Sequence, residues 1–321
     1  MNMLSNHALR EIHPGRSAPP WLLPWRGDAT ATAAPEPFCV GVCAADRILR
    51  QTRQVALGRH RSTRMHAHAA RCAYLLFHRS SVRLRTGPGR EEIATPLHVS
   101  LHAAGEIHAR EALSEEGHDY DFIAIAPALL QRLRTGVAGM RAASGDQSLL
   151  PARACEATAE IFLARRRLFA AASRSYGALN SRQIDAAVEH LLTLVIERAT
   201  ARHRFMCDQP RGIRGRRIQF IEEAKTILAR EYQTDLTAMG LADRLHCSPA
   251  YLSRTFHATT GFKLVDYRHE LRLRKAAYLI EHADAEIGEI AVRVGFASHS
   301  HFSSAFHRRF GITPSEYLNP A

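Results

Sequence analysis

The C-terminal third of the chain contains one short unit twice. The segment LADRLHCSPAYLSRTFHATTG (Leu241 to Gly261) recurs as IAVRVGFASHSHFSSAFHRRFG (Ile290 to Gly311). The first parts match at an offset of 49 residues and the second parts at an offset of 50, so the second copy has a turn that is one residue longer. Such an internal repeat indicates one supersecondary unit present in two copies.

Each copy reads as a short helix, a tight turn and a second helix. In the first copy Ser248 is a favourable N-cap residue and Pro249 occupies the first helical position. Leu252 and Phe256 follow at helical spacing as an apolar stripe, and in the second copy Gly295 makes the turn. The pattern predicts two helix-turn-helix motifs, in which the second helix enters the major groove of DNA.

The histidines of the second copy do not form a metal site with each other. His299 and His301 are two residues apart and therefore point about 200° away from each other on a helix. The face opposite the phenylalanines carries short polar groups, namely Ser300, Ser303, Ser304 and His307. Taken alone, this is an ordinary solvated helix face, but the duplication favours a surface that approaches DNA.

The segment between the two copies predicts a long helix. Lys263 to Ala283 has a helical pattern throughout and is about 30 Å long at 1.5 Å per residue, close to the ~34 Å of one DNA turn. Arg268, Arg272 and Lys275 follow one another at helical spacing along it, as phosphate contacts or as a solvated basic stripe. The formal net charge of +12 favours a polyanionic partner.

Residues 216–321 resemble the DNA-binding domain of the AraC/XylS family of bacterial transcription regulators. The most specific blocks are IAVRVGF…FSSAFHRRFGITPSEY and SPAYLSRTF–TTG. The resemblance implies a seven-helix domain with two helix-turn-helix motifs that binds promoter DNA and acts with RNA polymerase, usually as an activator. By position it places two sets of residues on the reading helices: Ala250, Ser253, Arg254 and His257, then His299, Ser300, Ser303 and Ser304.

Three positions depart from the family pattern. His246 stands where the first turn usually has glycine, so a left-handed backbone there costs somewhat more. Ala250 is short, and Ser304 replaces a position often held by a longer basic side chain. Arg254 is therefore expected to be the main base reader, and its expected partner is guanine.

The N-terminal half predicts strands. VRLRT (Val82 to Thr86) and LHVSL (Leu97 to Leu101) alternate apolar and polar residues, which indicates an antiparallel barrel or sandwich over residues 38–126. This region resembles the cupin-like sensor domain that precedes the DNA-binding domain in many family members. The fold class expected for the whole chain is α+β with two domains.

Four residues of this region match the metal-binding cupin pattern in part. His66, His68 and His108 fall at histidine positions, Cys72 falls at the position of a glutamate, and Ala103 replaces a proline. On a strand His66 and His68 point to the same side. Two interpretations stay open: a transition metal such as zinc, or histidines that are structural or line the site of a small-molecule effector.

The remaining segments complete the expected organisation. Residues 1–37 are expected to form a flexible arm. Residues 127–201 are expected to form connecting or dimerisation helices, which include Ala152 to Ala172 and Ser181 to Ala201. Residues 202–215 are expected to be a linker. The six cysteines are scattered, and there is no signal peptide or membrane-spanning run, so we expect a cytoplasmic, nucleoid-associated protein. The helices of residues 127–201 are expected to pack an interface, either within the chain or between the two chains of a homodimer. The sequence contains no nucleophile elbow, Walker A loop or GxGxxG motif. The alternatives to a regulator that responds to a small-molecule effector are a metal-dependent cupin enzyme fused to a DNA-binding domain, and a regulator without effector that is controlled by a partner or by its abundance.

Overall fold

The computed structural model describes residues 46–62, 66–69, 72–87, 90–104, 106–114, 117–136, 154–173, 179–207, 211–282 and 285–319. The chain forms two compact units. The first contains the chain up to Met206 except for residues 95–97, and the second contains those three residues and the chain from Cys207 onward. None of the described helices is long and apolar enough to span a bilayer.

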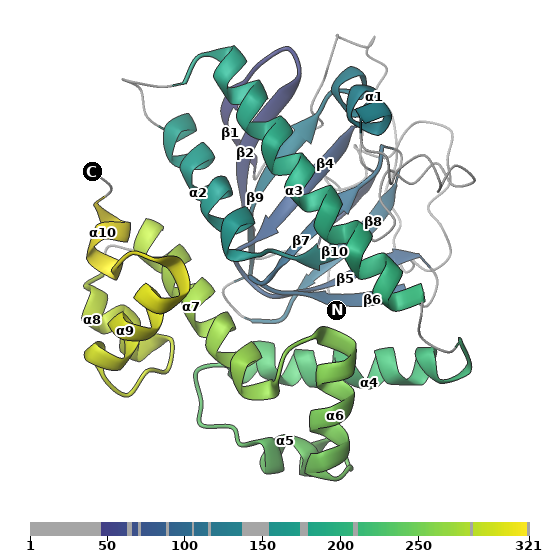
Figure 1. Ribbon diagram of the computed structural model, residues 1–321, viewed down its shortest axis with the longest axis vertical. Coiled ribbons are helices and arrows are strands. Elements are labelled where there is room, and N and C mark those ends of the chain that lie inside the picture. Colours follow the sequence, from purple (N-terminus) through teal and green to yellow (C-terminus); the bar gives the residue numbers. More distant parts are fainter. Residues whose placement is uncertain are drawn as a thin grey trace, which may run out of the picture. The chain divides into compact units, whose positions relative to one another are not determined.

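The first unit is built on two antiparallel sheets (Figure 1). The six-stranded sheet has the order β1 (Asp46–Gln51), β2 (Val55–Ser62), β9 (His118–Ile125), β4 (Ala73–His78), β7 (His98–His102) and β10 (Ala154–Glu156). The four-stranded sheet has the order β3 (His66–Ala69), β8 (Ile107–Ala112), β5 (Val82–Gly87) and β6 (Arg90–Ala94). The prediction of antiparallel strands in residues 38–126 is confirmed for the described residues.

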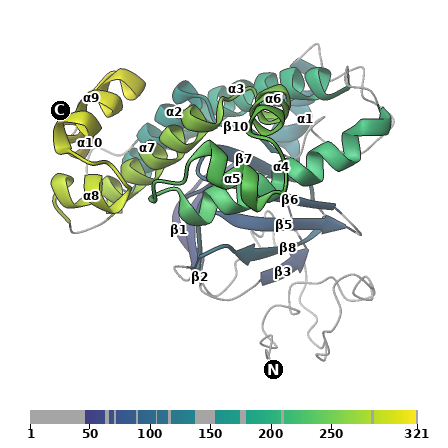
Figure 2. The same cartoon turned by 90° about the horizontal axis from the view of Figure 1, so that it is seen from below.

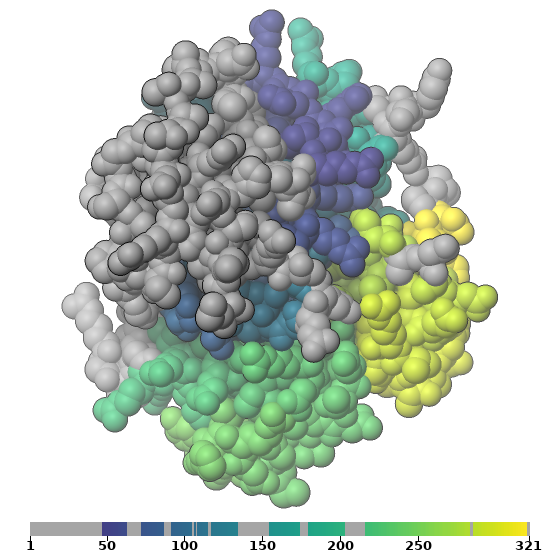
Figure 3. Space-filling model, turned by 180° about the vertical axis from the view of Figure 1, so that it is seen from behind, coloured from purple at the N-terminus to yellow at the C-terminus, as the bar shows by residue number. Residues whose placement is uncertain are grey.

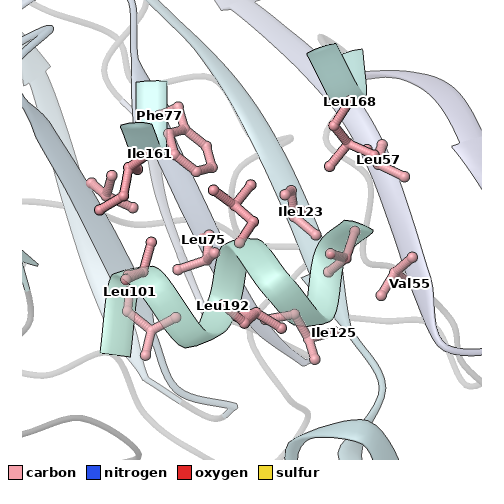
Figure 4. Packing of buried hydrophobic residues seen from close by; sticks show 14 of the residues in the cluster. Val55, Leu57, Leu75, Phe77, Leu101, Ile123, Ile125, Ile161, Leu168 and Leu192 are labelled. Carbon is pink, nitrogen blue, oxygen red and sulfur yellow. The ribbon is translucent and has the colours of Figure 1, made fainter. Parts of the chain in front are cut away.

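Helices cover one face of the six-stranded sheet. After α1 (Pro127–Gly136), helices α2 (Ala159–Ser173) and α3 (Ser181–Cys207) pack on the sheet (Figures 1 and 4). The apolar stripe of α3 is buried in this core and consists of Ile184, Val188, Leu191, Leu192 and Val195. Alternate residues of the strands supply the other side, for example Leu75 and Phe77 of β4. These helices therefore bury their apolar stripes within the unit.

A buried ion-pair cluster joins α2 to the same sheet. Asp121 of β9 has no exposed surface and pairs with Arg165 of α2, which is equally buried. Arg59 approaches the same carboxylate at 3.2 Å and Arg79 at 3.7 Å. Because an unpaired charge at such depth is strongly unfavourable, these ion pairs favour one position of α2 on the sheet.

The second unit is helical in its described residues from 211 onward. Its helices are α4 (Arg211–Glu231), α5 (Ala238–Arg244), α6 (Pro249–Thr260), α7 (Leu264–His282), α8 (Ile287–Arg293), α9 (His299–Phe310) and α10 (Pro314–Leu318) (Figures 1 and 2). Helix α5 corresponds to α8 at an offset of 49 residues and α6 to α9 at 50, so the predicted duplication and its longer second turn are confirmed.

Two segment predictions differ from the structure, and a third is untested. Residues 202–207 continue α3 and residues 211–215 begin α4, so the segment expected to be a linker is helical at both ends. The helix expected from Ala152 begins only at Ala159, because Ala154–Glu156 pairs with β7 instead. The expected N-terminal arm lies outside the described residues.

Candidate nucleic-acid interface

Local sequence signals fix both ends of the first helix-turn-helix. Thr237 caps α5 by accepting a hydrogen bond from the amide of Gly240 at 3.0 Å. Ser248 caps α6 by accepting one from the amide of Tyr251 at 3.2 Å, with Pro249 next to it at the start of the helix. Gly261 ends α6 in the left-handed conformation that favours glycine. Helix α6 is thus delimited by residues of its own sequence.

The outward face of α6 carries the residues assigned to it from the sequence. Leu252 and Phe256 are fully buried in a core shared with α4, α5 and α7. The opposite face is exposed and holds Ala250, Ser253, Arg254 and His257. Arg254 has the longest reach of these side chains, because the others are a methyl group, a hydroxymethyl group and an imidazole.

The second reading helix, α9, repeats this arrangement with different side chains. Ser298 caps it by accepting a hydrogen bond from the amide of His301 at 3.2 Å, while Phe302 and Phe306 are fully buried. Among the predicted reading residues, His299, Ser300, Ser304 and His307 are exposed and Ser303 is half-buried. The space-filling view shows side chains of this region, coloured yellow, at the molecular surface (Figure 3).

Two further residues share these exposed faces. Arg308 is exposed and lies one turn after Ser304, so α9 does carry a long cation, four residues later than the family pattern places one. Tyr251 is 42% exposed beside Ala250, with its ring centroid 5.5 Å from that of Phe220. Extending the helical spacing from Ser300 by eight residues would have found Arg308 in the sequence.

The basic residues of the connector do not form the stripe that their spacing indicated. Arg272 is only 5% exposed and donates to three backbone carbonyl groups, which leaves its guanidinium unavailable to a phosphate. Arg268 is half-buried and donates to the carbonyl oxygen of Leu236 at 2.5 Å. Lys275 is also half-buried. Arg272 and Arg268 therefore have a structural role inside the second unit, because buried polar groups form their hydrogen bonds within the protein.

Nearby charges set the electrostatics of this unit. Arg244 of α5 donates two hydrogen bonds to Glu231, at 2.6 and 2.8 Å, and these lower the pKa of that carboxyl. Partial burial, followed by the charges of Arg272 and Arg268, lowers the pKa of His269. We therefore expect His269 of the connector to be neutral at neutral pH.

The predicted N-terminal histidines lie on neighbouring strands. In the register of β3 and β8, His66 is opposite Arg110 and His68 is opposite His108. The side chains of His66 and His68 lie outside the described residues, so a site that includes them stays a prediction. His108 is fully buried and Cys72 is 5% exposed. Within the described residues, no group of three or more histidine, cysteine or acidic side chains is arranged to hold a metal ion.

A buried polar layer surrounds His108. It lies on the face of the six-stranded sheet away from α2 and α3. The His102 and His108 rings stack with centroids 4.0 Å apart, and the hydroxyl of Tyr74 lies 3.5 Å from Nε2 of His108. The guanidinium of Arg110 sits 4.4 Å from the centre of the Tyr120 ring. Strand β8 thus contacts β7, β4 and β9 through imidazole, phenol and guanidinium groups.

Comparisons with known proteins agree with the geometry of the second unit. Residues 241–320 match the family model described as a helix-turn-helix domain. The Msm operon regulatory protein of Streptococcus mutans is 31% identical over 98 residues, which are 30% of this chain and 35% of that protein. The transcriptional activator RhaR of Salmonella dublin is 29% identical over 116 residues, 36% of this chain and 40% of that protein.

The chain is also similar in sequence to a solved structure. A transcriptional regulator of Chromobacterium violaceum with an AraC-type DNA-binding domain is 29% identical, with 32% of this chain and 96% of that chain covered at a TM-score of 0.30. The chain spans 35% and 40% of the length of the two curated relatives above, and residues 241–320, which match the family model, contain the duplicated motif. The C-terminal part of the chain is a helix-turn-helix DNA-binding domain of the AraC/XylS family.

Proposed function

We propose that this chain is a sequence-specific transcription regulator of the AraC type, and an activator, that binds promoter DNA through α6 and α9 and contacts RNA polymerase there. The observation that carries the proposal is the duplicated helix-turn-helix with an exposed polar face on each second helix. The connector α7 has 19 residues, about 28 Å at 1.5 Å per residue, which suits two reading helices on one face of a duplex.

The two reading helices divide the recognition unequally in this proposal. Arg254 of α6 donates two hydrogen bonds to one guanine in the major groove, the commonest specific contact of an arginine. Helix α9 approaches the duplex closely through Ser300 and Ser304, and Arg308 binds a phosphate. Serine hydroxyls contact the sugar-phosphate backbone or either base edge. Helix α9 therefore recognises the position and shape of the DNA more than the identity of its bases.

The first unit, in this proposal, is a cupin-like barrel over residues 38–126 that binds a small-molecule effector, and the chain acts as a homodimer. The support is the buried layer around His102, His108 and Tyr74, which offers donors and acceptors in an enclosed setting. A transition metal held by His66, His68 and His108 is the competing proposal for the same layer.

Selection of DNA sequences from a random pool by the purified full chain tests the DNA-reading function. Arg254→Ala should weaken binding to the selected site by about 1–3 kcal/mol and relax the preference at one base pair. Arg230→Ala removes the same charge from an exposed position on α4 and should leave that base preference unchanged. An equal loss over all sequences in Arg254→Ala would instead make Arg254 a phosphate contact.

Transcription in vitro from the selected site tests activation and sensing. Added chain should raise transcript yield with RNA polymerase, and extracts of small metabolites should change that yield. Replacement of the buried His102 by leucine should abolish the change while DNA affinity stays within about threefold, less than 1 kcal/mol. A yield that falls on addition of the chain would make it a repressor. Bound metal that is lost with His66→Ala/His68→Ala would favour the metal proposal.

A further inference from the structure

Arg272 of α7 joins the two helix-turn-helix units. Its side chain is almost fully buried, and its guanidinium makes three hydrogen bonds to backbone carbonyl oxygens. Nε donates to Tyr232 at 2.6 Å and Nη2 donates to Thr234 at 2.8 Å, both in the segment that follows α4. Nη1 donates to Gly295 at 2.5 Å, in the turn between α8 and α9. The guanidinium of Arg272 therefore forms hydrogen bonds at once with the segment that leads into the first helix-turn-helix motif and with the turn of the second.

The backbone of the turn between α8 and α9 lies directly against the same segment, which follows α4. A Cβ atom at Gly295 would lie 2.8 Å from the Cα of Gln233 and would overlap its carbonyl oxygen. It would also lie 2.9 Å from Cζ of Arg272. Real Cβ contacts are not that short, so the junction has no room for a side chain and its packing is tight.

The first helix-turn-helix packs against helix α4, which leads directly into this segment. Helix α4 shares a buried core with α5 and α6, through Leu228, Leu241 and Phe256 among others. The segment that accepts two of the Arg272 hydrogen bonds begins at Tyr232, directly after α4 ends. A constraint between this segment and Gly295 is therefore a constraint between the two reading helices.

We propose that Arg272 is a positioning residue that fixes the distance and rotation between α6 and α9, and so makes DNA binding depend on the spacing of the two half-sites. The proposal rests on the proposed function, in which both units bind one duplex. Each inserted base pair moves the second half-site by about 3.4 Å and rotates it by about 35°. A rigid pair of reading helices fits only one spacing, whereas a loosened pair tolerates several.

Arg268 provides a matched control on the same helix. It lies one turn before Arg272 and donates to the carbonyl oxygens of Leu236 at 2.5 Å and Thr234 at 3.5 Å. Both acceptors lie in the segment between α4 and α5. Loss of Arg268 therefore weakens the contacts to this segment without breaking the hydrogen bond from Arg272 to Gly295, which separates local stability from the positioning of the two reading helices.

The experiment measures binding of the full chain to its selected DNA and to derivatives with one or two base pairs added or removed between the half-sites. The unchanged chain should lose tenfold or more in affinity at each altered spacing, which is about 1.4 kcal/mol. Arg272→Gln should bind the original spacing more weakly and vary less than about threefold over the series. Arg272→Lys should be intermediate, and Arg268→Gln should keep the steep dependence of the unchanged chain.

The outcomes are separable. A folded Arg272→Gln variant that keeps the steep spacing dependence would overturn the inference, as would Arg268→Gln flattening the series to the same extent. If thermal unfolding shows that Arg272→Gln does not fold, the comparison of Arg272→Lys with Arg268→Lys decides in the same way. Failure of the unchanged chain to select any DNA would overturn the proposed function, and this inference with it.

Discussion

His246 and Gly295 occupy the same position in the turns of the two helix-turn-helix units, and both have a left-handed backbone, with φ of 51° and 90°. The family pattern has glycine at the position of His246, and a left-handed backbone there costs a histidine more than a glycine. The structure shows that left-handed backbone at His246. The two turns differ in their surroundings. His246 is exposed, whereas a Cβ atom at Gly295 would meet the backbone of Gln233, between α4 and α5.

Replacing His246 by glycine should stabilise the protein. A left-handed conformation costs a residue with a Cβ about 1–2 kcal/mol, and glycine loses part of this gain through the greater freedom of its unfolded chain. We expect the free energy of unfolding to rise by about 0.5–1 kcal/mol in urea denaturation followed by circular dichroism. DNA affinity should not fall. A lower stability would mean that the imidazole makes a contact worth more than the strain.

Gly295→Ala should be much more damaging than the same change at Gly311. Both glycines have positive φ, but a Cβ at Gly311 meets nothing within 4 Å, so only the conformational cost of about 1 kcal/mol applies there. At Gly295 the overlap with Gln233 adds about 1–3 kcal/mol, as for overpacked cores. Thermal unfolding of both variants measures the difference. Equal losses of stability in the two variants would show that the backbone around Gly295 and Gln233 shifts to accommodate the added Cβ atom.

The elements of the second unit were predictable because their signals are local. Ser248, Pro249 and Gly261 delimit α6, and each acts within four residues of its own position. The role of Arg272 was not predictable in the same way. Its spacing from Arg268 indicated a surface stripe, but its acceptors at Tyr232 and Gly295 are 40 and 23 residues away. Sequence spacing along one helix carries no information about such partners.

In the first unit, strand pairing between segments that are distant in the sequence was likewise not predictable from local patterns. The alternation of apolar residues located β5 and β7 correctly, because period two is a property of the strand itself. Strand β10 is three residues long and precedes a strong helical pattern. It is a strand only because Cys155 pairs with Val99 of β7, 56 residues earlier in the chain. Segments this short take their structure from tertiary context.

Arg308→Ala should lower DNA affinity by a similar factor for all sequences. The side chain is exposed toward the end of α9, where a reading helix leaves the base edges, so we expect a phosphate contact. Loss of one phosphate contact reduces the slope of log affinity against log salt concentration by about 0.9. Binding measured from low to moderate salt checks this value. An unchanged slope together with an altered base preference would make Arg308 a base reader.

Acid should destabilise the first unit through His78. Its side chain is 1% exposed, and burial followed by the charge of Arg110 lowers its pKa from 6.5 to about 3. Between these two values the unfolded chain binds a proton that the native protein does not, so stability falls as the pH is lowered from about 6.5 toward 3. From pH 7 to pH 5 this one residue should remove about 2 kcal/mol.

The variant His78→Asn isolates this contribution. Asparagine retains a hydrogen-bonding group near Ser100, whose hydroxyl lies 2.6 Å from Nε2 of His78, but it does not titrate. The difference in unfolding free energy between pH 7 and pH 5 should therefore shrink by about 2 kcal/mol. His190→Asn removes an exposed imidazole from α3 and should leave the difference as in the unchanged chain. A difference in His78→Asn equal to that of the unchanged chain would show that His78 is already protonated in the native protein at pH 5.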